Sequence, residues 1–64
     1  MNISKFIKQE RLKKKLSVKE LAELSGFSFK TIYTWESGEK NITFKSFEKL
    51  LDVFGLEIAI KRKE

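Results

Sequence analysis

The sequence contains no cysteine, no histidine and no proline among its 64 residues. Without cysteine there is no disulfide bond, and without cysteine and histidine there is no zinc site of the usual kind, so neither a metal nor another cofactor is expected. The commonest general base and the thiol nucleophile are also missing, which argues against an enzyme. A chain this short buries only about 60% of its unfolded surface, so its stability must come from close packing or from a partner subunit.

Long hydrophobic runs are absent as well, because no apolar stretch approaches the ~18–20 residues of a membrane span. Charged residues interrupt every early apolar stretch, so we expect no signal peptide and a cytoplasmic protein that does not bind membranes. Positive charge is in excess, with 14 lysine and arginine residues against 9 acidic ones. The excess lies in residues 1–16 and 56–64 and suggests an anionic partner, with nucleic acid as the first candidate and a solvated lysine face as the alternative.

Small polar residues that precede apolar periodicity predict four helices. Asn2 or Ser4 is the candidate N-cap of the first helix, and Ser17 with Glu20 has the pattern of a capping box at the second. Glycines end the later helices in the usual way. The expected ranges are about 3–14, 17–25, 28–37 and 43–54. After Gly55 the period changes, since Leu56–Lys61 alternates apolar and polar residues as a strand does.

Two of these helices are short and are joined by a turn of four residues, which predicts a steep crossing angle. Ala22 is small where the helices must pass closely, and Gly26 allows a left-handed turn conformation. The spacing Leu-Ala-x3-Gly-x5-Ile-x2-Trp-Glu-x-Gly, from Leu21 to Gly38, resembles the helix-turn-helix of the lambda-repressor/Cro (XRE) family. The similarity extends over about residues 7–55. It implies an all-α, four-helix domain that binds operator DNA and regulates transcription.

The third expected helix has two faces on a helical wheel of about 100° per residue. Ile32, Trp35 and Glu36 point one way with Ser28, while the opposite face is polar or amphipathic. A recognition helix presents such a face to the major groove, where lysine can donate to guanine and the Phe29 ring or the Thr34 methyl can contact a thymine methyl. The predicted base contacts are Phe29, Lys30, Tyr33 and Thr34. Ordinary solvent-facing residues are the alternative interpretation.

Phosphate contacts position a protein on DNA without reading sequence. The N-terminus of the second helix, with its free N–H groups, is one candidate, and the resemblance implies another just after the recognition helix. The candidate residues are Lys19, Ser28, Ser37, Lys40 and Asn41. Val18 stands where the family often has a phosphate-binding glutamine, so that contact is not expected here. Polar residues are common at the position of Phe29, so the target bases cannot be transferred by analogy.

Glu36 is the one carboxylate on the inward face of the third helix, and a buried carboxylate needs a partner. Arg11 on the first helix is the expected partner, and similar family members pair an arginine here with a glutamate at the end of the recognition helix. The alternative is two exposed charges that never meet. The pair would orient the recognition helix rather than contact bases.

The alternating segment at the C-terminal end has no second strand in the chain with which to pair. We therefore expect residues 1–55 to form the DNA-binding domain and residues 56–64 to form a dimerisation strand with a basic tail. Antiparallel pairing with a second copy would bury Leu56, Ile58 and Ile60 in a two-fold homodimer. A frayed terminus is the alternative.

The run Phe54-Gly55-Leu56-Glu57-Ile58-Ala59-Ile60 resembles the strand that follows the last helix in HipB-like antitoxins. This resemblance implies an autoregulating antitoxin, a dimer that represses from palindromic DNA and binds a HipA-like toxin kinase. A phage or plasmid repressor without a toxin partner is the alternative that shares the same DNA site.

Overall fold

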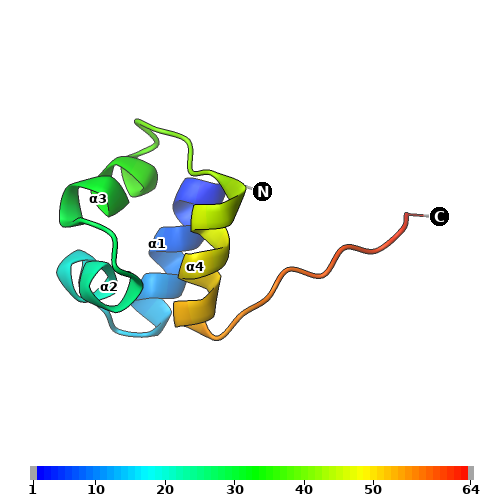
Figure 1. Cartoon of the computed structure of the whole chain (residues 1–64), viewed down its shortest axis with the longest axis horizontal. Coiled ribbons are helices and arrows are strands. Elements are labelled where there is room, and N and C mark those ends of the chain that lie inside the picture. Colours follow the sequence, from blue (N-terminus) through cyan, green and yellow to red (C-terminus); the bar gives the residue numbers. More distant parts are fainter. Residues whose placement is uncertain (1, 64) are drawn as a thin grey trace.

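The computed structural model describes residues 2–63. Met1, the first residue of the predicted DNA-binding domain, and Glu64, the last residue of the predicted dimerisation segment, lie outside it. Four helices follow one another: α1 (Ile3–Lys13), α2 (Val18–Ser25), α3 (Phe29–Ser37) and α4 (Phe44–Phe54). The prediction of four helices is confirmed. Helix α3 packs against α1 and α2, and α4 packs against α1 and α2 from another side (Figure 1).

Each helix begins at a short polar side chain that accepts a hydrogen bond from a backbone N–H three residues further on. These N-caps are Asn2, Ser17, Ser28 and Thr43. Of the two candidates at the first helix, the N-cap is therefore Asn2. Helices α2, α3 and α4 end at glycines in the left-handed conformation, as expected. The caps explain why the helix bounds follow the sequence prediction closely.

The hydrophobic core draws on all four helices. Two edge-to-face aromatic pairs contribute to it, with ring centroids 5.9 Å apart for Phe6 and Phe47 and 4.8 Å apart for Phe27 and Trp35. Burying one such side chain contributes roughly 1.5–3 kcal/mol. The buried apolar residues are Ile7, Leu21, Ala22, Ile32, Trp35, Phe47, Leu50, Leu51 and Phe54. Because α3 is anchored through Ile32 and Trp35, its opposite side is left at the surface.

The C-terminal segment leaves the helical body after Gly55 and runs away from it (Figure 1). The Leu56 N–H donates a hydrogen bond to the Leu51 carbonyl of α4, at 2.8 Å. Residues 56–63 form neither helix nor strand, and Ile60 is 90% exposed. The single chain therefore neither forms the expected strand nor buries Leu56, Ile58 and Ile60.

Candidate nucleic-acid interface

Helices α2 and α3 lie on the side of the molecule opposite the C-terminal segment (Figure 1). The turn between them is held by Gly26, whose φ is +81°, and by the Ser25 hydroxyl, which donates to the Leu21 carbonyl at 2.7 Å. The Phe27 ring lies against Trp35 of α3. These contacts fix α3 at a set angle to α2, as a helix-turn-helix requires.

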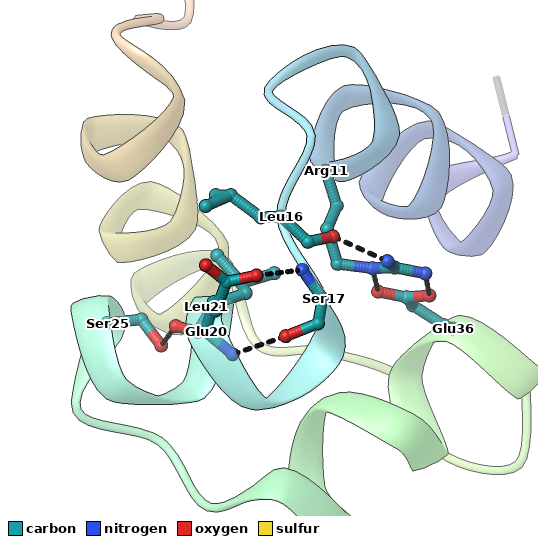
Figure 2. Close-up of polar contacts among 7 residues, drawn as sticks. All are labelled: Arg11, Leu16, Ser17, Glu20, Leu21, Ser25 and Glu36. Atoms are coloured by element: carbon teal, nitrogen blue, oxygen red, sulfur yellow. Dashed lines mark hydrogen bonds and ion pairs between the residues drawn. The ribbon is translucent and has the colours of Figure 1, made fainter.

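Arg11 and Glu36 form the ion pair that the sequence predicts. The Arg11 Nε and Nη2 atoms donate to the two carboxylate oxygens of Glu36 at 2.8 and 2.9 Å, and Nη1 donates to the Leu16 carbonyl at 2.8 Å (Figure 2). Both side chains are more than nine-tenths buried. The hydrogen bond to Glu36 raises the pKa of Arg11, and desolvation opposes that rise. One guanidinium thereby joins α1, the turn before α2, and the end of α3.

The N-terminus of α2 carries the capping box that the sequence predicts. The Glu20 N–H donates to the Ser17 hydroxyl at 3.0 Å, and the Ser17 N–H donates to the Glu20 carboxylate at 2.9 Å (Figure 2). The pKa of the Glu20 carboxyl is lowered first by its hydrogen bond with the Ser17 backbone N–H and then by its hydrogen bond with the Ser17 side chain. Lys19, a predicted phosphate contact, is exposed in the first turn of α2.

The outward face of α3 is aromatic and basic. Phe29 and Tyr33 lie one turn apart and are each 55% exposed. Lys30 and Ser37 are exposed on the same helix, and so is Ser28 at its N-cap. The outward orientation predicted for Lys30 and Tyr33 is confirmed, and Ser37 lies at the surface as well. Ser28, which the wheel placed on the inward face, lies at the surface because it precedes the first turn.

Thr34 does not lie where the sequence places it. Its side chain is only 8% exposed, and its hydroxyl donates to the Thr31 carbonyl at 2.7 Å. The chain folds back after Gly38, and the Lys40 N–H donates to the Thr34 carbonyl at 3.2 Å. The prediction that Thr34 faces outward was wrong, because a helical wheel considers one helix alone and does not include the turn after Gly38 that covers this side of α3. Thr34 thus offers little open surface from which to contact bases.

Several of the predicted DNA contacts share one shallow depression of about 330 Å³ on the surface of α3. Lys30 and Lys40 both line it, together with Ser28 and Thr34. Asn41 lies in a separate depression at the N-terminus of α1, beside Asn2 and Lys40. The structure therefore brings together Lys30 of α3 and Lys40, which follows α3. Lys19 lies apart from them on α2. Their contacts with phosphate remain predictions.

A basic residue that the sequence reasoning missed is Lys8. It lines a cleft of about 300 Å³ between α1 and α3, together with Tyr33, Val18 and Ser37. The spacing of three residues between Lys8 and Arg11 is the signal that could have found it, since residues three apart share one helix face. Lys8 adds a positive charge beside the exposed ring of Tyr33.

Other kinds of site find no support in the described part of the chain. Among residues 2–63, no cluster of three or more potential ligands is placed to hold a metal ion. Within the same range, no helix combines the length and apolar character needed to cross a membrane.

Two comparisons with known proteins both indicate a helix-turn-helix protein. A helix-turn-helix family model matches residues 7–61. Proteins named as HTH-type transcriptional regulatory proteins from Saccharolobus islandicus and Saccharolobus solfataricus are each 35% identical to the chain over 53 residues. The aligned region covers 83% of this chain but only 17% of each relative. The similarity thus concerns one domain of much longer proteins.

Proposed function

Because the chain belongs to the helix-turn-helix family, we propose that it is a sequence-specific DNA-binding transcriptional regulator that acts as a repressor. The family consists of regulators and not of enzymes, which bears out the expectation of a non-enzymatic protein. The observation that carries the proposal is the geometry of α3. Ile32 and Trp35 are buried, whereas Lys30 and Tyr33 on the other side are open to solvent.

The assignment of roles follows from this geometry. Helix α3 enters the major groove, where Phe29, Lys30 and Tyr33 contact base edges. Lys19, Lys40 and Asn41 contact phosphates, and Ser28 and Ser37 add hydroxyl groups near the backbone. Thr34 is left out of the base contacts because it is buried. A DNA target is consistent with the expected cytoplasmic location.

Dimerisation is the second part of the proposal. The alternating side chains Leu56, Ile58 and Ile60 are all exposed in the single chain, and a lone strand leaves its backbone groups unpaired. Antiparallel pairing of residues 56–64 from two copies would cover these side chains and leave residues 1–55 as the DNA-binding part. Such a two-fold dimer reads palindromic half-sites one helical turn apart, about 34–36 Å.

The most specific form of the proposal is an autoregulating antitoxin of the HipB-like kind, with a HipA-like toxin kinase as its partner. Its support is the Phe54–Ile60 motif together with the exposure of the apolar residues in it. A phage or plasmid repressor without a toxin partner is the alternative. Co-purification of the tagged protein from its native cells distinguishes them, because only an antitoxin retains a kinase-like protein.

The proposed function is tested by selecting bound fragments from random duplex DNA. We expect one palindromic motif to be enriched, and its affinity to fall steeply with salt because bound phosphates release counterions. Lys30→Ala should weaken binding to that motif by about 1–3 kcal/mol. Lys13→Ala is the matched control: it removes the same charge, but Lys13 pairs with Glu10 beside the C-terminal segment. Failure to enrich any motif would contradict the proposal.

A further inference from the structure

Helix α3 has few groups with which to recognise bases by hydrogen bonds. Resting on the proposed function, we infer that its specificity comes mainly from the methyl groups of thymines, which Phe29 and Tyr33 contact in the major groove, with Lys30 adding one guanine. The proposal assigns a class of target sequence to this helix, namely half-sites with thymines beside a guanine.

Helix α3 lacks the side chains that recognise adenine or cytosine by hydrogen bonds. Its sequence, FKTIYTWES, contains no asparagine, glutamine, arginine or aspartate. Bidentate recognition of adenine uses asparagine or glutamine, and cytosine N4 is read by an acidic acceptor. The single acidic residue of α3, Glu36, has both carboxylate oxygens bound to Arg11. Helix α3 therefore has no side chain for either of these patterns.

Most hydroxyl groups of α3 and its N-cap form hydrogen bonds within the helix. The Ser28 hydroxyl donates to the Thr31 hydroxyl at 2.7 Å, and the Ser37 hydroxyl donates to the Thr34 carbonyl at 3.2 Å. Thr34 itself is buried and donates to the Thr31 carbonyl. Lys30 remains as the exposed cation of α3, and a lysine ammonium suits guanine N7 and O6.

Helix α3 exposes aromatic surface to solvent. Phe29 and Tyr33 are each 55% exposed, and the aromatic pairs of residues 2–63 involve other rings. Exposed rings gain free energy when apolar surface covers them. The apolar group that duplex DNA offers in the major groove is the thymine 5-methyl. Two rings one helical turn apart, with Lys30 next to Phe29, thus match thymines near a guanine.

Uracil substitution tests this inference directly, because uracil differs from thymine by that methyl group alone. Each thymine of the selected operator is replaced by uracil in turn, and the Kd is measured by fluorescence anisotropy. We expect at least one position per half-site to lose about fourfold in affinity, the factor for one buried methyl group. Uracil at thymines outside the half-sites should change nothing.

Protein variants then connect the methyl groups to the two rings. Phe29→Ala should abolish the effect of uracil at one position, and Tyr33→Ala should abolish it at another. Tyr33→Phe retains the ring and should keep the sensitivity, and Lys30→Ala should keep it while losing discrimination at the guanine. Circular dichroism identifies any variant that fails to fold, and Phe29→Leu then replaces Phe29→Ala, with a smaller sensitivity expected.

The outcomes separate this inference from the proposed function. A selected motif without thymine in the half-sites, or full affinity with every uracil, would overturn the methyl recognition while leaving sequence-specific binding intact. Uracil sensitivity that persists unchanged in both alanine variants would also overturn it. Failure to select any motif would instead reject the proposed function.

Discussion

The guanidinium of Arg11 binds both carboxylate oxygens of Glu36, at 2.8 and 2.9 Å, across 25 residues of sequence. The same guanidinium also binds the Leu16 carbonyl, immediately before the cap of α2. Since Glu36 lies near the end of α3, the Arg11 side chain links α1 both to the start of α2 and to the end of α3. The proposed recognition surface thus depends on a contact that touches no DNA.

Breaking this pair from one side should destabilise the fold. Glu36→Gln leaves Arg11 buried with a neutral partner, and hydrogen bonds to charged groups contribute about 1.5–3 kcal/mol. We expect the free energy of unfolding in urea to fall by about that amount. Arg11→Lys should behave similarly, because an ammonium cannot reproduce the planar, bidentate contact.

The matched control for the ion pair is the double variant Arg11→Met with Glu36→Leu. Apolar residues of similar size remove both charges, so no uncompensated charge stays buried, and stability should recover in part. The assignment of Arg11 and Glu36 as a coupled pair would be contradicted if the double variant lost more unfolding free energy than the sum of the losses in the two single variants.

Thr34→Val should affect stability and not DNA affinity. Valine removes the hydrogen bond from the hydroxyl to the Thr31 carbonyl, which costs about 0.5–1.5 kcal/mol of unfolding free energy. Operator affinity at a temperature where the variant is folded should stay within about twofold, a change of roughly 0.4 kcal/mol. Anisotropy titrations measure this beside Lys30→Ala, and an equal loss in both variants would show that Thr34 does reach the DNA.

The capping box at α2 should make part of the stability depend on pH. Its hydrogen bonds lower the pKa of Glu20 below the ordinary value of 4.5. The folded chain therefore favours the ionised form of Glu20. This preference contributes to the free energy of unfolding above the ordinary pKa, and the contribution is lost as the pH falls through the lower pKa of the folded chain. Denaturation between about pH 6 and pH 3 should show this decline.

Glu20→Gln is the variant that isolates this effect. Glutamine still accepts the bond from the Ser17 N–H, but it does not titrate, so the difference from the wild type should shrink as the pH is lowered. Glu48→Gln makes the same charge change on the exposed surface of α4 and should leave the decline in place. An identical pH profile for Glu20→Gln and the wild type would exclude the carboxylate as its source.

Removal of residues 56–64 should leave a folded helical monomer with weakened operator binding. The helical core contains none of the deleted side chains, whereas the proposed dimer depends on Leu56, Ile58 and Ile60. Sedimentation velocity measures the mass, and circular dichroism reports the helices. Ile58→Asp in the full chain should have the same effect on mass, while Glu57→Gln should not. A truncated chain that still sediments as a dimer would reject pairing through this segment.

Local sequence signals predicted most of the fold. Helix starts could be predicted at Ser17, Ser28 and Thr43, because their side chains accept hydrogen bonds from free backbone N–H groups. Glycines indicate where the helices end. The Arg11–Glu36 pair was also predictable, since a carboxylate on an apolar face requires a cation and the family resemblance indicated which one. Both kinds of prediction depend on chemistry that the residues carry with them.

Features that depend on how separate segments pack against one another were harder to predict from the sequence. Thr34 is covered because the turn after Gly38 folds back over it, and the periodicity of a single helix contains no such information. Lys8 was missed because the cleft beside Tyr33 exists only once α1 and α3 are packed. The predicted pairing of the C-terminal segment with a second copy stays a prediction, because residues 56–63 form no strand in the single chain.

NMR titration of the isotope-labelled chain with its selected operator shows whether the exposed face of α3 lies in a groove of duplex DNA. We expect the largest amide shift changes at Ser28–Ser37 and at the N-terminus of α2. Changes confined to α4 and residues 56–63, with α3 unaffected, would contradict this placement of α3.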